Sequence, residues 1–134
     1  MVEIPHLALG GVQRQLVTLL EAARADGSAS VIVSCGVFAV EFSFADGRVR
    51  AQTGPDASKA SGETLSLEDE TVLLILGWRR DEGRPTFRRD WHPNTATHDV
   101  VADVVRTAEH AYQCPPEDLR VLLRVAEPAE ASLT

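Results

Sequence analysis

Residues that could hold a metal or act as a nucleophile are few and scattered in this sequence. His110 and Cys114, four positions apart near the expected end of a helix, could supply half of a zinc site. The other half is missing, because His98 lies at the far end of the same helix. Ser34 and Cys35 lie in "VSCGV", which lacks the G-x-S-x-G pattern of a nucleophile elbow. We therefore expect no metal, no cofactor and no catalytic set, and an enzyme using Cys35 or a His110–Cys114 metal site is the least favoured hypothesis.

The clustered carboxylates have a structural explanation. Residues 68–70 ("EDE") follow Ser66 at the expected beginning of a helix, where acidic side chains interact favourably with the helix dipole. Asp99 and Asp103 share one helical face, and their like charges favour a solvated face over an acid–base pair. Neither group predicts general acid–base catalysis.

The segment 73–91, "LLILGWRRDEGRPTFRRDW", contains both tryptophans of the chain, five arginines and three acidic residues. A strand would place Arg88 and Arg89 on opposite faces, so the arginines cannot form one flat basic patch. The net charge of −7 also repels a phosphate backbone. These features predict no nucleic-acid binding. They favour a structural role in which Trp78 folds back onto the preceding helix and Trp91 packs within the next strand, although a binding groove stays possible for both.

The length of 134 residues predicts one domain spanning 1–134. A hydrophobic content of 44% and a charged content of 25% are typical of folded proteins. The N-terminal sequence carries Glu3 and no basic segment, so it does not resemble a signal peptide. The longest aliphatic run, Val72 to Leu76, is too short to span a membrane. The two cysteines form no C-x-x-C pair, which favours a reduced, cytoplasmic protein.

Hydrophobic periodicity predicts the order α-β-β-β-α-β-α-β. In residues 37–44, Phe38, Val40, Phe42 and Phe44 recur at every second position, which indicates a half-buried strand packed on the first helix. The predicted elements are a helix over 12–25, strands over 30–34, 37–44 and 48–53, a loop over 54–62, a helix between Ser66 and Gly77, an extended segment at 87–91, a helix beginning with Thr97 as its cap and reaching Tyr112, a strand over 119–125, and a frayed tail over 127–134. This order indicates an α+β fold in which helices flank an antiparallel meander sheet.

Four short motifs follow one another in the second half of the chain. They are Leu76-Gly77-Trp78, Phe87-Arg88-Arg89-Asp90-Trp91, the helical stretch Val101 to Tyr112, and Pro116 to Leu119. In this order they resemble the actinobacterial TY-Chap domain family, chaperone-like proteins related to type III secretion chaperones and YbjN. The resemblance covers about residues 12–125. Two departures are Thr86, where the family pattern has asparagine, and the loop 54–62, which lacks the apolar residues expected there.

The resemblance implies a secretion-chaperone-like, non-catalytic module that binds a peptide or protein partner and forms a homodimer. A sequence pI near 5.0 and a meander with an edge strand open to strand addition agree with it. The expected peptide-binding residues combine an exposed sheet face with the tryptophan segment; they are Val37, Ala39, Val49, Ala51, Trp78, Phe87 and Trp91. The alternative is an immunity-type or regulatory protein that inhibits one partner through an acidic surface, which the net charge of −7 favours.

Overall fold

The structure is a computed structural model and describes residues 2–4, 11–27, 30–36, 38–45, 48–55, 65–82, 86–115 and 118–124. The helices are α1 (Gly11–Asp26), α2 (Leu67–Ile75) and α3 (Thr97–Ala111). The strands are β1 (Val2–Ile4), β2 (Ser30–Cys35), β3 (Phe38–Ala45), β4 (Arg48–Pro55), β5 (Arg79–Arg80), β6 (Phe87–Trp91) and β7 (Arg120–Arg124). Val37, most of the predicted loop 54–62 and the tail 127–134 lie outside the described residues.

The strands form one sheet in the order β1-β7-β2-β3-β4-β6-β5, and every neighbouring pair is antiparallel. The predicted α+β class and the predicted sequence of elements are confirmed, with β2, β3 and β4 as the meander. The edge strands β1 and β5 were not predicted. They contain three and two residues, too few for a periodic pattern to be recognised.

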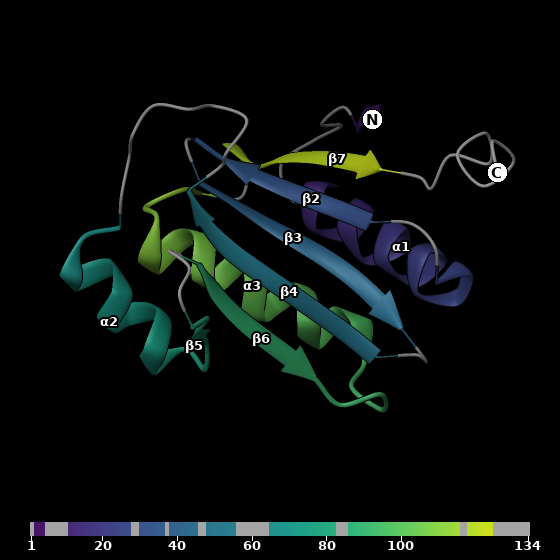
Figure 1. Ribbon diagram of the computed structural model, residues 1–134. Coiled ribbons are helices and arrows are strands. Elements are labelled where there is room, and N and C mark those ends of the chain that lie inside the picture. Colours follow the sequence, from purple (N-terminus) through teal and green to yellow (C-terminus); the bar gives the residue numbers. More distant parts are fainter. Residues whose placement is uncertain are drawn as a thin grey trace, which may run out of the picture.

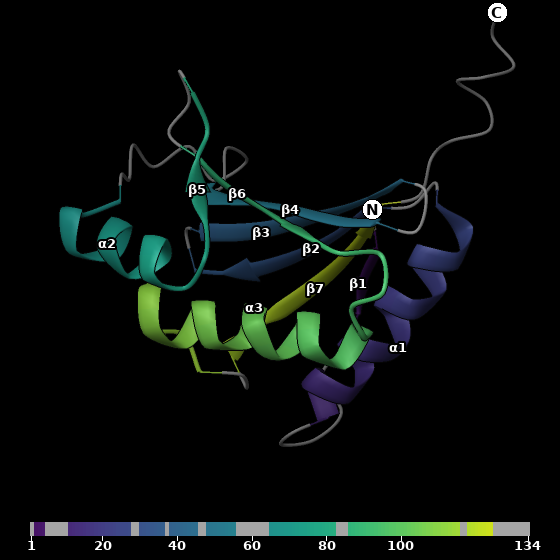
Figure 2. The ribbon, with the colours of Figure 1, turned by 90° about the horizontal axis from the view of Figure 1, so that it is seen from below.

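The helices α1 and α3 lie side by side on one face of the sheet (Figures 1 and 2). The helix α2 lies at one end of the molecule, beside α3 and β5 (Figure 2). No described helix covers the opposite face, which we call the open face because Ser43, Arg50 and Asp90 are exposed there. On the same face, Ile32 and Ser34 of β2 are buried. None of the helices in the described part of the chain is long and apolar enough to cross a membrane.

The register of β3 and β4 decides which side chains reach the core. Ala45 pairs with Arg48, so Phe44 lies opposite Val49 and Phe42 lies opposite Ala51. Directly paired residues share a face of the sheet. Val49 and Ala51 are consequently 2% and 0% exposed, beneath the helices. The expectation that these two residues lie on an exposed sheet face is therefore wrong.

The turn after α2 returns the chain to the core. Ser66 accepts a hydrogen bond from the Asp69 amide at the beginning of the helix, as predicted. At the other end, Gly77 has a φ of +99°, and the amides of Gly77 and Trp78 donate to the carbonyls of Leu74 and Leu73. These are the two bonds of a Schellman motif, which needs a left-handed residue at the position of Gly77. The motif directs Trp78 inward.

The helix α3 begins one residue earlier than predicted. Its N-terminal cap is Ala96, which makes no side-chain capping bond, and Thr97 is the first helical residue. The predicted cap at Thr97 is wrong, because the Ala96 carbonyl already accepts the amides of Asp99 and Val100. The apolar face itself is as expected. Its fully buried side chains include Val101, Val104 and Ala108.

Replacing Trp78 by alanine should reduce the free energy of unfolding by about 3 to 5 kcal/mol, because a fully buried aromatic side chain leaves a cavity. Trp78 is 1% exposed. Urea unfolding monitored by circular dichroism would measure the change. A matched substitution at an exposed position of α3, Glu109→Ala, should change stability by less than about 0.5 kcal/mol. An unchanged midpoint for Trp78→Ala would contradict the core assignment.

Candidate binding surface on the open sheet face

The aromatic residues of the segment 73–91 belong to the core and not to a groove. Trp78, Phe87 and Trp91 are all buried, and the two indole rings meet edge to face with their centroids 6.1 Å apart. The ring of Phe42, from the centre of the sheet, lies 6.3 Å from that of Trp91. Three of the expected peptide-binding residues therefore hold the fold together and are inaccessible to a partner.

A polar network accompanies these aromatic rings. The indole N–H groups of Trp78 and Trp91 donate to Thr107 Oγ1 and Asp103 Oδ2, each at 3.0 Å. The Arg89 guanidinium forms an ion pair with Asp103 Oδ2 at 3.0 Å and donates to the carbonyl of Leu76 at 2.7 Å. Arg89 also lies 4.9 Å above the Trp91 ring, within the range of a cation–π contact. The network joins the end of α2, β6 and α3.

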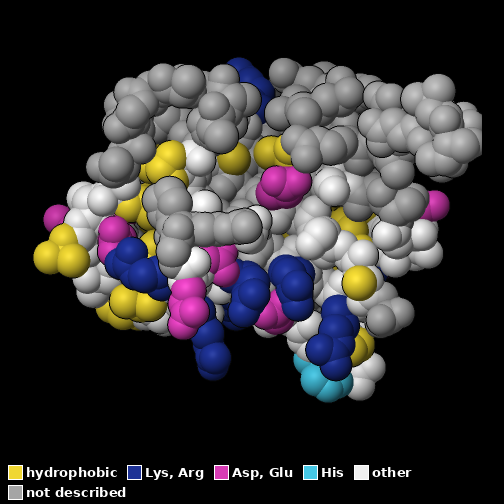
Figure 3. All heavy atoms as spheres, viewed as in Figure 1, with side chains coloured by type: hydrophobic (Ala, Val, Ile, Leu, Met, Phe, Trp, Pro, Cys, Tyr) yellow, Lys and Arg dark blue, Asp and Glu magenta, His cyan; other side chains and the backbone are white. Residues whose placement is uncertain are grey.

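The open face of the sheet carries the side chains that alternate with the core positions. Arg88 and Arg89 project to opposite faces as predicted, so that Arg88 lies on this open face. The neighbouring strands contribute Glu41 and Ser43 from β3, Arg48, Arg50 and Gln52 from β4, and Asp90 from β6. Figure 3 shows basic side chains gathered over β4 and β6, with acidic side chains between them. Ala39 is half-buried and is the one described residue of the expected set that lies on this face.

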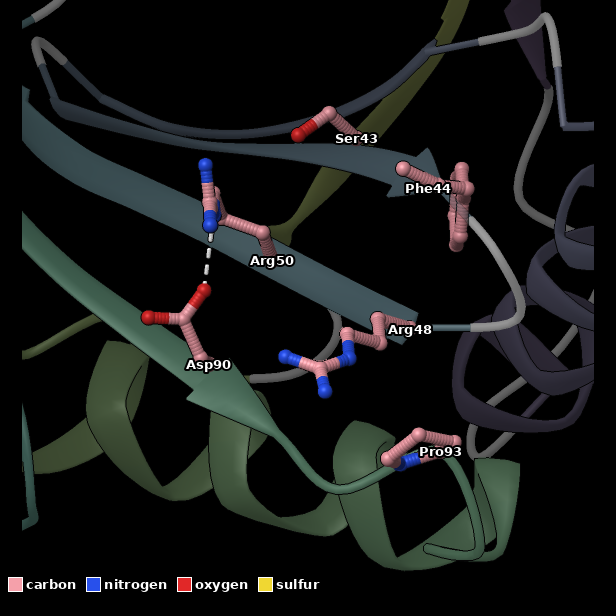
Figure 4. A pocket seen from close by; sticks show the side chains of 7 residues that line it. Ser43, Phe44, Arg48, Arg50, Asp90 and Pro93 are labelled. Carbon is pink, nitrogen blue, oxygen red and sulfur yellow. Dashed lines mark hydrogen bonds and ion pairs between the residues drawn. The ribbon is translucent and has the colours of Figure 1, made fainter.

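A hollow of about 520 Å³ opens on this face where β3, β4 and β6 lie side by side. Its lining residues are Ser43, Phe44, Ala45, Arg48, Arg50, Asp90 and Pro93. Figure 4 shows the Arg50 guanidinium turned toward Asp90, and the two groups form an ion pair with Nε and Oδ1 2.7 Å apart. Phe44, Ala45 and Pro93 make the opposite end of the hollow apolar. Its size lies within the range of about 300 to 1,000 Å³ that is typical of ligand sites.

The acidic groups around the hollow are already engaged. Asp90 also has Arg88 Nε 3.7 Å from its other carboxylate oxygen. Asp81, on the far side of Arg88, accepts hydrogen bonds from Gln52 and Thr86. In the described part of the chain no carboxylate lies within ion-pair distance of Arg48. Among the described residues, the guanidinium of Arg48 therefore lines the hollow without an ion-pair partner.

A second exposed surface lies on the outer side of α2. Leu67, Leu74 and Ile75 are 81%, 54% and 77% exposed, although Leu73 on the inner side is fully buried. Residues 67, 74 and 75 recur at the spacing of one helical face. Figure 3 shows hydrophobic side chains at this end of the molecule. Such a surface is a candidate for contact with another protein.

The histidine and cysteine pair does not form one helical face. The helix α3 ends at Ala111, and Gln113 has a φ of +52°, so Cys114 lies beyond a change in chain direction. Cys114 is buried, whereas His110 is exposed. Among the described residues, no group of three or more histidine, cysteine, aspartate or glutamate side chains is arranged to hold a metal ion.

Sequence reasoning missed the hollow around Arg48 and Arg50. The signal that could have identified it is the pairing of Ala45 with Arg48, because this register places Arg48, Arg50 and Gln52 on the face opposite the core. Comparisons of the chain with protein-family models, with curated proteins and with solved structures each find no match. The resemblance to the TY-Chap family therefore stays a prediction.

We expect Asp103→Ala to reduce the free energy of unfolding by about 1 to 3 kcal/mol, since it leaves Arg89 and the Trp91 indole without their partner. A double-mutant cycle with Arg89→Met would give the coupling energy, which should be about 0.5 kcal/mol or more. Arg106→Met is the matched control, because Arg106 Nη1 lies 3.8 Å from Asp103 but is largely exposed. Strict additivity of Asp103→Ala and Arg89→Met would show that the two side chains act independently.

Proposed function

We propose that the chain is a non-catalytic, chaperone-like module that binds a polypeptide partner on the open face of its sheet. The observation that carries this proposal is the exposed part of the open face, with its hollow between β3, β4 and β6. The opposite face is filled by α1 and α3, so the open face is the broad surface of the sheet on which a partner can lie. The resemblance to the TY-Chap family implies the same activity, and a cytoplasmic setting is part of the proposal.

The edge of the sheet offers a second contact for an extended partner segment. The predicted edge of the meander is not available, because β4 pairs with β6 and β2 pairs with β7. Beyond β6, however, the short strand β5 pairs only with Phe87 and Arg88. Residues 89–91 have no further strand beside them among the described residues. A partner strand added there would continue the sheet next to Asp90 and the hollow.

The exposed side of α2 supports the proposal that the module is a homodimer. Two copies of α2 packed antiparallel about a twofold axis would bury Leu67, Leu74 and Ile75 against each other. The same arrangement brings the acidic beginning of one helix, with Glu68, toward the basic residue Arg79 that follows the other. The charges of the two ends are therefore complementary across the proposed axis.

A regulatory or immunity-type protein that inhibits one partner is the second candidate. The net charge of −7 favours it, because an acidic surface attracts a basic partner over long range. The two functions differ in their dependence on salt. Binding to an acidic surface weakens steeply as salt is added, whereas binding of an extended segment along the sheet edge, through backbone hydrogen bonds, weakens much less.

The test of the proposed function is an affinity purification from the protein's own host followed by cross-linking and mass spectrometry. We expect one stoichiometric polypeptide, with cross-links to β4 and β6. A partner cross-linked only to α1, on the covered side of the sheet, would contradict the assignment of the open face. Repeating the purification at low and high salt separates the chaperone-like function from the inhibitory one.

The proposed dimer is tested by Ile75→Lys with light scattering after size-exclusion chromatography. Ile75 is 77% exposed and lies in the last turn of α2, where a cation suits the helix dipole, so the monomer should stay folded. The variant should elute as a monomer where the unmodified protein elutes as a dimer. Thr18→Lys, at an exposed position of α1, is the control and should leave the dimer intact. A dimer that persists in Ile75→Lys would exclude this surface.

A further inference from the structure

The hollow on the open face differs in charge from the protein as a whole. The chain carries a net charge of −7, yet the lining of the hollow presents two arginines and one carboxylate, Arg48 and Arg50 against Asp90. Asp90 is shared between Arg50 and Arg88. The excess positive charge therefore belongs to Arg48, which faces no carboxylate within ion-pair distance in the described part of the chain.

The donors in the hollow suit a planar anion. Figure 4 shows both guanidinium groups, with that of Arg48 in the space between Asp90 and Pro93. Arg50 uses its Nε for Asp90, which leaves its two terminal nitrogens for another acceptor. Guanidinium groups match a carboxylate through two parallel hydrogen bonds, which a lysine cannot supply. The Ser43 hydroxyl is a further donor in the same lining.

A residue of α1, on the covered side of the sheet, fixes the segment that borders the hollow. Arg24 of α1 donates from its two terminal nitrogens to the carbonyls of Pro93 and Thr95, in the segment between β6 and α3. These bonds hold Pro93 near the beginning of β4, where it forms an apolar wall with Phe44 and Ala45. The arginines therefore lie in a formed hollow, with apolar surface on one side for the methylene groups of a ligand.

We infer that this hollow is a subsite for the carboxylate of a glutamate or aspartate in an acidic segment of the polypeptide partner, with Arg48 as its principal ligand. The inference rests on the proposed function and names the chemical class of the partner. An acidic segment fits better than a nucleic acid, because Asp90 and Glu41 interrupt the arginines and would oppose a continuous phosphate backbone. A single carboxylate beside Arg48 meets only Asp90, whose charge is offset by its ion pairs with Arg50 and Arg88.

A defined probe tests the subsite. N-acetylated, C-amidated hexaglutamate is titrated into the uniformly ¹⁵N-labelled protein, and the arginine Nε–Hε signals are followed by NMR. We expect the signals of Arg48 and Arg50 to shift in a saturable manner, and the neutral hexaglutamine peptide to cause no shift. Arg48→Gln should weaken binding by about fivefold, because Arg48 is exposed and a charge pair in solvent contributes at most about 1 kcal/mol. Arg48→Lys should restore part of the affinity, because it returns the charge but not the paired donors.

Arg14→Gln is the matched control, since it removes the same charge from an exposed position of α1, beneath the other face of the sheet. It should leave the dissociation constant unchanged. If Arg14→Gln and Arg48→Gln weaken the binding of hexaglutamate equally, the effect comes from the overall charge of the protein and the proposed subsite is wrong. Absence of any shift with hexaglutamate would also overturn it. Saturation by inorganic phosphate at lower concentration than by hexaglutamate would assign the hollow to phosphate and contradict a carboxylate ligand.

The subsite and the proposed function fail in different ways. If the cross-linked partner binds the unmodified protein and Arg48→Gln with equal affinity, the subsite is wrong and the polypeptide-binding function stands. If hexaglutamate binds through Arg48 but no polypeptide is recovered on β4 and β6, the anion subsite stands and its assignment to a polypeptide partner is wrong.

Discussion

The ion pair between Arg89 and Asp103 joins three parts of the protein that are distant in sequence. Asp103 lies on α3, Arg89 on β6, and the second bond of Arg89 reaches the carbonyl of Leu76 at the end of α2. Both partners are only about one quarter exposed, so the pair is screened less than a surface pair. Asp103 also accepts a hydrogen bond from the Trp91 indole N–H. The same carboxylate therefore positions both the Arg89 guanidinium and an aromatic ring of the core.

The left-handed backbone of the turn after α2 explains the glycine at position 77. Its φ of +99° is unfavourable for any other residue, whereas a Cβ atom there would only make ordinary contact with the Arg89 guanidinium carbon, 3.4 Å away. The Gly77 conformation brings Trp78 back into the core, where its indole N–H reaches Thr107. The arginine-rich segment 73–91 is therefore largely the connection between α2, β6 and α3, which agrees with the structural role that its sequence favoured.

Because two helices cover one face of the sheet, polar side chains on the other face are accessible to a partner. The helices α1 and α3 cover the side formed by Val40, Phe42 and Ala51, and the polar side chains that alternate with these residues are left in solvent. A further set of hydrogen bonds joins β3, β4 and the end of α3. Thr53 is hydrogen-bonded to the Tyr112 hydroxyl and donates to the carbonyl of Ala39. The surface that we propose for binding is thus a consequence of how the core is packed.

The sequence by itself determined the class of the fold, because periods of 3.6 and 2 residues identify the helices and the meander strands without knowledge of their partners. It also determined the turn at Gly77 and the separation of Arg88 from Arg89, which depend on local geometry. Only the tertiary structure decided that Val49 and Ala51 are buried, since a one-residue difference in register exchanges the two faces of a strand. The hollow around Arg48 likewise depends on the tertiary structure, because β6 lies beside the β3–β4 hairpin although α2 and β5 separate them along the chain.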